Sequence, residues 1–337
     1  MKKTCKTLLA LLLLAAALWG LCNAVTPLLT PKRYDYGCLW QAYEKEDRNS
    51  IDVMFFGSSI AYCDVIPAMI YQQTGLTSYT MAGPTQTMPQ TYYYIRQALE
   101  TQSPATMFVE VTALFYPVHQ EFDAVNIGYM PNGWNKWRAM AASTAPSTWI
   151  RYLLPLYNYH YRWSQLQPDD YTRAREGYDL DPLAGYTYLP RTTPFPEMEP
   201  KGETYTAAEY EKNEAYLLKI RDLCAEKGIR LVLYLSPRCN TLSQESQDRL
   251  AATLEKAQVS FVDFDTQKAA IGLDPLTDYY DRSHLNAQGA EKFTQYLSDY
   301  LENTLVLTPQ AGHDNALWQR RIDYLNELRQ QTKEAAQ

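Results

Sequence analysis

The chain has 337 residues, enough for one large domain or two smaller ones, and its net charge of −7 argues against a nucleic-acid-binding protein, which would carry a basic surface. Hydrophobic residues make up 46% of the chain and charged residues 20%, so a packed core is expected and long disordered segments are not. The 28 tyrosines and 7 tryptophans fill part of that core. Those on the surface would suit ligands that combine apolar faces with hydroxyl groups, such as sugars.

The N-terminal 25 residues resemble a membrane-targeting segment. Three lysines occur within the first six residues, and an apolar run follows from Leu8 to Cys22. Because about 20 apolar residues cross a bilayer, the run predicts a single membrane anchor, with the lysines in the cytoplasm and the rest of the chain outside. The alternative is a signal peptide cleaved at the weak small-x-small site 22–24, which would give a secreted protein. Both alternatives predict export, with residues 26–50 as a polar juxtamembrane segment.

Six cysteines are present, and none shows the Cys-x-x-Cys spacing of a zinc site, so no metal site is predicted. Cys5 and Cys22 lie in or before the anchor, and Cys38 and Cys63 follow it. The other two, Cys224 and Cys239, flank one predicted strand. They either pair across that strand or stay as free buried thiols.

Beyond residue 50, short apolar runs alternate with helical patterns. Strands are predicted at 51–56, 77–81, 105–111, 229–237 and 259–264, and helices at 60–73, 86–100, 206–227, 243–257 and 287–303. Strands that alternate with helices of this length indicate an α/β fold with a parallel, doubly wound sheet.

Residues 112–204 interrupt the alternation. This segment contains Trp134, Trp137, Trp149 and Trp163 as well as a tyrosine cluster at 152–161, and it shows no clear strand. It begins at the carboxyl end of the third strand, where loops of open α/β sheets surround the ligand crevice. We therefore expect an insertion that covers the site; a purely structural cap is the alternative. Residues 304–337 predict a polar C-terminal helix that either packs on the domain or projects from it.

The stretch Gly57-Ser58-Ser59 lies between the first strand and the following helix. Glycine permits a tight turn there, and a serine at a helix start lies beside unpaired backbone N–H groups, which stabilise negative charge. Such a serine suits a nucleophile whose attack creates an oxyanion. The alternative is a helix-capping serine, which is a common use of the residue.

Asp281 and His284 favour the catalytic interpretation. A serine nucleophile needs a base within hydrogen-bonding distance, and that base needs an acceptor that orients it. An aspartate three residues before a histidine can fold back within one turn and accept from Nδ1–H of the ring. Nε2 is then free to face the serine. The alternative roles are a capping or core histidine and an aspartate in a turn.

These motifs resemble the SGNH/GDSL hydrolases over residues 51–303, apart from the insertion. The resemblance implies a flavodoxin-like three-layer α/β/α sandwich with about five parallel strands. It is similar in particular to membrane-anchored members with a Gly-Ser-Ser motif, a group that includes the D-alanyl transfer protein of teichoic-acid operons. The Gly-x-Ser-x-Gly motif of α/β-hydrolases is absent, because Ala61 occupies its last position.

The resemblance also assigns roles to residues. Ser59 corresponds to the nucleophile, with Ser58 where the family usually has aspartate; Ser58 is a candidate contact for the substrate or the oxyanion. Asp281 and His284 correspond to the Asp-x-x-His of the last block. The backbone N–H groups of Ser59 and Gly83 correspond to donors of the oxyanion hole.

One position departs from the family pattern. The third block normally supplies an asparagine to the oxyanion hole, and this chain has Glu110 and Thr112 at the end of its third strand with no asparagine. The loss of one such donor typically costs about 10²–10³ in rate. Thr112, Gln86 or a residue of the insertion would have to replace it, or Glu110 is a buried carboxylate with a structural partner.

These observations lead us to expect an exported serine esterase or O-acyltransferase that forms an acyl-enzyme and needs no metal or organic cofactor. Its expected substrate is an acylated cell-envelope polysaccharide, peptidoglycan or a teichoic-acid-like polymer, and a membrane O-acyltransferase is an expected partner. The alternative is a catalytically degenerate protein of the same fold that binds a cell-envelope glycan or a membrane partner.

Overall fold

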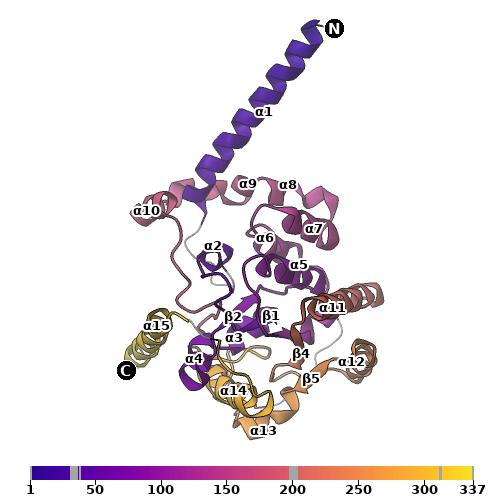
Figure 1. The fold of residues 1–337 in the computed structure, drawn as a ribbon, viewed down its shortest axis with the longest axis vertical. Coiled ribbons are helices and arrows are strands. Elements are labelled where there is room, and N and C mark those ends of the chain that lie inside the picture. Colours follow the sequence, from indigo (N-terminus) through magenta and orange to yellow (C-terminus); the bar gives the residue numbers. More distant parts are fainter. Residues whose placement is uncertain (1, 31–36, 38, 197–203, 311–312, 336–337) are drawn as a thin grey trace.

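The computed structural model describes residues 2–30, 37, 39–196, 204–310 and 313–335 (Figure 1). Helix α1 (Lys2–Leu29) extends away from a globular body, to which its last turns are attached. The helix runs four residues beyond the predicted anchor and continues past Pro27. Thr26 Oγ1 donates to Cys22 O and Thr30 Oγ1 donates to Thr26 O, so side chains supplement the backbone hydrogen bonds of these turns.

Five parallel strands form one sheet in the order β2-β1-β3-β4-β5. Their bounds are Val53–Gly57 for β1, Ser78–Ala82 for β2, Thr106–Glu110 for β3, Arg230–Leu235 for β4 and Ser260–Asp263 for β5. This order is that of flavodoxin-like folds, in which ligands bind where the strand order reverses, between β1 and β3. The predicted fold class is confirmed.

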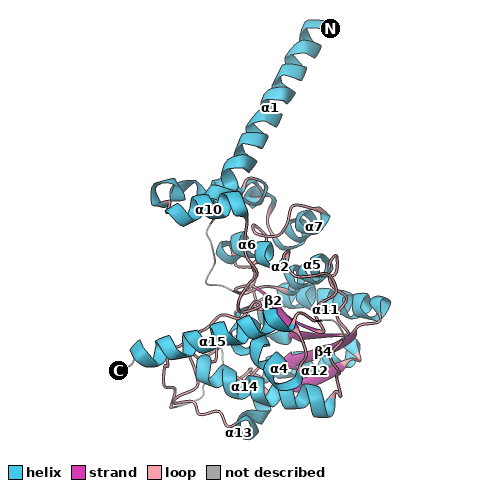
Figure 2. Ribbon diagram, turned by 60° about the vertical axis from the view of Figure 1, so that its left-hand side comes forward, coloured by secondary structure: helices cyan, strands magenta, loops and turns pink. Residues whose placement is uncertain are grey.

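Both faces of the sheet are buried under helices, as expected for a parallel sheet. Side chains alternate along each strand: Met54 and Phe56 of β1 lie in one core cluster, and Val53 and Phe55 lie in the other. Helices α5 (Met88–Ala98), α11 (Ala207–Lys227) and α12 (Gln244–Ala257) contribute to the first cluster. Helices α4 (Pro67–Thr74), α13 (Lys268–Ile271), α14 (Ala287–Asp299) and α15 (Asn315–Ala335) contribute to the second. Figure 2 shows the strands between these two layers.

The helix predicted at 60–73 is two helices, α3 (Ser59–Asp64) and α4, separated by an extended Val65 and Ile66. Pro67 explains the break, because it cannot donate an N–H to a preceding turn and disfavours a helical residue before it. Proline is well accommodated in the first turn of a new helix, which is its position in α4. The short α3 is therefore held between β1 and α4.

The insertion contains no strand among its described residues. It comprises the turn Val111–Phe115 and the helices α6 (Gln120–Asn126), α7 (Trp134–Ser143), α8 (Ile150–Leu153), α9 (Pro155–Tyr159) and α10 (Pro168–Glu176). Helices α9 and α10 pack against α1, and Figure 1 shows α7 to α10 gathered at the foot of that helix. Residues 181–195 then return along the sheet, where Thr80 N donates to Ala184 O. We call α6 to α10 with their connections, residues 120–176, the cap.

The C-terminal helix α15 packs on the domain, which decides between the two predicted alternatives. Trp318, Ile322 and Leu325 are buried on it. The buried guanidinium of Arg321 forms an ion pair with Glu46, in the segment that joins α1 to β1 through α2 (Trp40–Tyr43).

Cys224 and Cys239 are free buried thiols, so they do not form the disulfide that was one of the alternatives. Cys5, Cys22 and Cys63 are also free, and Cys38 lies outside the described residues.

Candidate active site

The turn from β1 to α3 places Ser59 at the carboxyl end of β1, beside the point where the strand order reverses. Gly57 allows this turn to pass close to β3, because a Cβ at position 57 would lie 2.8 Å from the Cβ of Glu110. Ser58 is fully buried, and its Oγ lies 3.2 Å from the hydroxyl of Tyr116. The predicted contact of Ser58 with substrate is therefore not what the structure shows. Ser59 is half-buried and is the first residue of α3, where backbone N–H groups have no partner within the helix.

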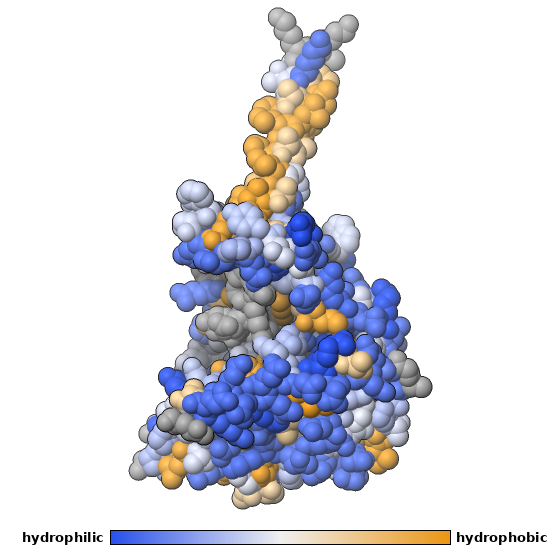
Figure 3. All heavy atoms as spheres, turned by 90° about the vertical axis from the view of Figure 1, so that its left-hand side faces the viewer, coloured by the Kyte–Doolittle hydropathy of each residue, from blue (hydrophilic) through white to orange (hydrophobic). Residues whose placement is uncertain are grey.

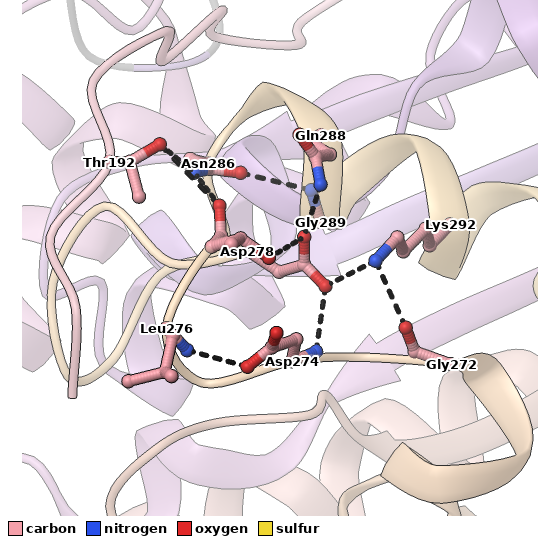
Figure 4. Close-up of polar contacts among 10 residues, drawn as sticks. Thr192, Gly272, Asp274, Leu276, Asp278, Asn286, Gln288, Gly289 and Lys292 are labelled. Atoms are coloured by element: carbon pink, nitrogen blue, oxygen red, sulfur yellow. Dashed lines mark hydrogen bonds and ion pairs between the residues drawn. The ribbon is translucent and has the colours of Figure 1, made fainter. Parts of the chain in front are cut away.

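The loop before α14 holds Asp281 and His284, and it is built around a buried carboxylate, Asp278 (Figure 4). Asp278 Oδ2 accepts from Lys292 Nζ at 2.6 Å and from Asp274 N at 2.7 Å, and its Oδ1 accepts from Gln288 Nε2 at 2.9 Å. These donors come from both sides of the loop. Asp278 therefore ties the loop to the first turns of α14.

Asn286 and Gly289 fix the start of α14 (Figure 4). Asn286 is the N-cap, and its Oδ1 accepts from Gly289 N at 3.0 Å, while its own N–H donates to Asp278 O. A Cβ at position 289 would lie 2.1 Å from Asp278 O, so this crossing requires glycine. A further bond, from Tyr280 N to His284 O, closes the loop around the histidine.

Ser59, His284 and Asp281 form a continuous chain of hydrogen bonds. His284 Nε2 lies 2.7 Å from Ser59 Oγ, and His284 Nδ1 lies 2.9 Å from Oδ1 and 2.8 Å from Oδ2 of Asp281. The sequence predicts that Ser59 and the loop with Asp281 and His284, more than 200 positions apart, meet at one edge of the sheet. The structure brings them together there.

The charge of Asp281 fixes the tautomer of the ring. Burial alone would raise the pKa of Asp281, but the hydrogen bond and charge of His284 and the N–H groups of Ser283 and His284 lower it below its ordinary value. Asp281 Oδ1 accepts from these two N–H groups at 2.7 and 3.0 Å. An ionised Asp281 can only accept hydrogen bonds, so Nδ1 of His284 carries the proton, and Nε2 of the neutral ring can accept from the Ser59 hydroxyl.

A second carboxylate, Asp64 at the end of α3, lies on the other side of this loop. It is fully buried; its Oδ1 accepts from Leu285 N at 3.1 Å and its Oδ2 accepts from the Ser236 hydroxyl at 2.5 Å. Burial raises the pKa of Asp64 to about 7, although Ser236, the charge of His284 and Leu285 N–H oppose the shift. Asp64 thus connects the helix that carries the serine to the residue that follows the histidine.

Gly83 lies at the same edge of the sheet as Ser59. In the pairing of β1 with β2, Gly57 is opposite Ala82, so the residues that follow, Ser58 and Gly83, leave the sheet side by side. A Cβ at Gly83 would lie 2.1 Å from Asn126 Oδ1. The side chain of Gln86 is buried, and its Nε2 donates to Thr91 Oγ1 at 3.0 Å in α5.

Glu110 and Thr112, at the end of β3, bind each other. Thr112 N and Thr112 Oγ1 donate to the Glu110 carboxylate at 3.0 and 2.5 Å. Burial raises the pKa of Glu110 to about 7, while the Arg238 guanidinium and Thr112 act in the opposite direction. The structure therefore supports the alternative in which Glu110 is a buried carboxylate with a structural partner.

Arg238, Asp64, Ser236 and Asp278 contribute to this region and were not identified from the sequence. Arg238 is only 2% exposed and follows β4. Two of them could have been found from their proximity to predicted site residues in the sequence: Asp64 follows Ser59 by five residues, and Asp278 precedes His284 by six. No group of three or more potential metal-ligating side chains occurs in the described ranges.

No family model and no curated protein sequence matches the chain. Solved structures with a similar fold include a GDSL-like lipase from Bacteroides thetaiotaomicron, with 10% identity, a TM-score of 0.36 and coverage of 75% of this chain and 88% of that one. An acetylxylan esterase from Geobacillus stearothermophilus shows 11% identity and a TM-score of 0.37, and the match covers 76% of this chain and 94% of that one. Values this low describe a distant similarity in overall arrangement, so the chemistry of the site has to be judged from its own residues.

Proposed function

We propose that the chain is a serine esterase or O-acyltransferase of the SGNH/GDSL type, with Ser59 as nucleophile, His284 as general base and Asp281 as the residue that orients the base. The observation that carries the proposal is the unbroken hydrogen-bond chain from Ser59 Oγ through both ring nitrogens of His284 to Asp281. Binding a ligand does not require this arrangement, whereas activating a serine hydroxyl does.

The reaction follows from the roles of the three groups. Ser59 Oγ attacks the carbonyl carbon of an ester while its proton passes to Nε2 of His284, and Asp281 stabilises the charged ring. The tetrahedral intermediate collapses to an acyl-Ser59 ester, and the departing alkoxide takes the proton from Nε2. Water, or a hydroxyl of a sugar or polyol, then attacks the acyl-enzyme with the same base. Positioned proton transfer of this kind contributes about 10²–10⁴ in rate.

The oxyanion of the tetrahedral intermediate would bind to the backbone N–H groups of Ser59 and Gly83. The register of β1 and β2 supports this pairing, because it brings both segments out of the sheet together. Glu110 and Thr112 are engaged with each other and are poor candidates for a third donor.

The proposed substrate is an acyl ester on a cell-envelope polymer, such as a polysaccharide, peptidoglycan or teichoic acid. One helix, Thr4–Leu29, is long and apolar enough to cross a membrane, and a signal sequence would pass the same criterion. We propose that α1 is an uncleaved anchor that holds the catalytic domain outside the cell, where a membrane O-acyltransferase would be a natural donor or acceptor of acyl groups.

A degenerate glycan-binding protein is the second candidate, favoured by the missing asparagine after β3. A fluorophosphonate probe separates the two, because it labels only an activated serine. Offered to the full chain in detergent, it should label Ser59, and Ser59→Ala and His284→Ala should lose both the label and the hydrolysis of p-nitrophenyl acetate.

The matched controls are Ser164→Ala and His160→Ala, both on the exposed turn His160–Gln165, which should retain label and activity. Equal hydrolysis by Ser59→Ala and the unsubstituted chain would exclude the proposed nucleophile. Failure of the unsubstituted chain to react with the probe would favour the binding protein.

A further inference from the structure

The cap carries an unusual concentration of exposed aromatic side chains. Among the described residues, the exposed tryptophans and tyrosines outside α1 are Trp134, Trp137, Tyr157, Tyr161, Trp163 and Tyr171, all in the cap. Trp134 is 79% exposed and Trp163 is 73% exposed. Burying such side chains is favourable, so their concentration in one segment of the chain indicates a contact with something outside it. We call these six residues the aromatic patch.

The cap is less acidic than the rest of the chain. Residues 120–176 contain six basic and five acidic residues, and the remainder of the chain contains 25 basic and 33 acidic residues. Within the cap, residues 124–168 contain no aspartate or glutamate, and Arg138 and Arg151 in this stretch are exposed. This part of the cap therefore suits an anionic partner better than the acidic body does.

The cap also surrounds the point where α1 leaves the body. Helix α1 packs against α9 and α10, and Arg162 Nη1 donates to Leu29 O at 2.8 Å. Figure 3 shows the apolar α1 rising directly from this end of the molecule. Whatever surrounds α1 therefore lies against the cap as well.

The length of α1 brings the cap to the bilayer surface. The 26 residues from Thr4 to Leu29 span about 39 Å at about 1.5 Å per residue, which exceeds the roughly 30 Å of a hydrocarbon core. The last turns of α1, which pack against α9 and α10, therefore lie at the level of the headgroups, and the cap lies there with them. Asn23 Nδ2 donates to Trp19 O and Thr26 Oγ1 donates to Cys22 O, so these polar side chains are satisfied within the helix.

A cavity at the same level has the character of a lipid site. It occupies about 320 Å³, and its lining includes Trp19 and Asn23 of α1, Lys136, Trp137 and Met140 of α7, Asn132 and Tyr152. The Lys136 side chain is buried, and its Nζ donates to Gly128 O at 2.8 Å. A mainly apolar cavity with two amides in its lining and an opening beside α1 suits part of a lipid that lies against that helix.

We propose that the cap is a second membrane contact: the aromatic patch enters the headgroup region of an anionic bilayer around α1, and the exposed Arg138 and Arg151 bind lipid phosphates. Tryptophan and tyrosine are the residues enriched at this depth of a membrane. The proposal rests on the membrane anchor of the proposed function and is independent of the esterase chemistry.

The test is fluorescence quenching of the full chain in vesicles of phosphatidylcholine and phosphatidylglycerol whose acyl chains are brominated just below the headgroup. Trp19→Phe removes the tryptophan of α1, and the quenching that persists reports the cap. We expect the further change Trp134→Phe/Trp163→Phe to remove most of this quenching. Both side chains are highly exposed, so the fold should be unaffected, which circular dichroism checks.

The matched control is Trp318→Phe in the Trp19→Phe chain, because Trp318 is buried in α15 and should not meet lipid. Replacing the mixture by phosphatidylcholine alone, or adding salt, should reduce the quenching of the cap tryptophans, since anionic lipid attracts the basic residues.

If Trp134 and Trp163 are not quenched while Trp19 is, the cap stands clear of the lipid and the proposal is wrong; the aromatic patch would then belong to a protein partner. If Trp19→Phe itself changes nothing, α1 is not inserted and the proposed anchor fails. Hydrolysis of p-nitrophenyl acetate by the chain in detergent tests the proposed chemistry independently of the cap contact and of the anchor.

Discussion

At the scale of single residues, two carboxylates on either side of the histidine loop have opposite properties. Asp281 accepts from His284 Nδ1 and from two backbone N–H groups, and these bonds lower its pKa. Asp64 is fully buried, and burial raises its pKa to about 7. Divergent pKa values of neighbouring acids commonly mark a division of roles. Here Asp281 would stabilise charge on His284, and Asp64 positions the loop through Leu285 N–H.

Asp281→Asn should lower kcat by about 10²–10⁴-fold, with little change in KM for p-nitrophenyl acetate. The Asn Oδ1 still accepts from the backbone N–H groups, so the loop is preserved. Its amide donates toward Nδ1, which moves the ring proton to Nε2 and removes the base. Steady-state kinetics measures the effect, with the exposed Asp299→Asn on α14 as control. An unchanged kcat would contradict the role of Asp281.

Stability should fall as pH rises from about 5 to 8. In the unfolded chain Asp64 and Glu110 lose their protons near ordinary values of 3.8 and 4.5, and in the folded chain near 7. Between these limits the folded state binds more protons, so the free energy of unfolding decreases with rising pH. Asp64→Asn removes one of these contributions. Urea midpoints at pH 5 and pH 8 should differ less in this variant than in the unsubstituted chain or in the exposed control Glu255→Gln.

At the scale of elements, the helix–loop crossing at α14 is a tightly packed part of the site. Gly289→Ala places a methyl group 2.1 Å from Asp278 O, which forces the start of α14 away from the loop that holds His284. We expect a loss of about 1–3 kcal/mol in the free energy of unfolding and a loss of probe labelling at Ser59. Gly133→Ala is the control, because a Cβ there meets nothing within 4 Å. Full labelling in Gly289→Ala would show that the loop tolerates the shift.

The elements also show where sequence patterns suffice. The five strands were predicted within about two residues of their bounds, because buried parallel strands are short apolar runs between turn residues. The helices of the cap were not predicted, since they are short and irregular. Ser59 was predicted because it directly follows a strand end. Asp281 and His284 were predicted because they lie only three residues apart. Asp64 and Ser236 were not, because they meet across 172 positions and only the fold brings them together.

At the scale of the whole molecule, the last helix holds the beginning of the domain. Arg321 of α15 forms a buried ion pair with Glu46, and its Nε donates to Asp181 O at 3.1 Å. The juxtamembrane segment, the end of the insertion and the C-terminal helix therefore meet at one guanidinium. This contact and the buried Trp318, Ile322 and Leu325 hold α15 on the body although most of its residues are polar.

Arg321→Met should destabilise the full chain by about 3–5 kcal/mol, because it leaves the Glu46 carboxylate buried without its partner. Adding Glu46→Gln should recover part of the loss, since a neutral amide is less costly to bury. Arg320→Met on the exposed side of the same helix is the matched control. Urea unfolding in detergent measures all four proteins. Equal effects of Arg320→Met and Arg321→Met would show that the ion pair contributes nothing.

The distance along the chain between Ser59 and His284 has a consequence for biogenesis. In the proposed export route, a precursor threading through a secretion pore in an extended state has its nucleophile and its base on opposite sides of most of the domain. The proposed hydrolytic activity would then arise only after the segment around His284 has emerged and folded. The order of the chain itself would thus delay assembly of the catalytic centre until export is nearly complete.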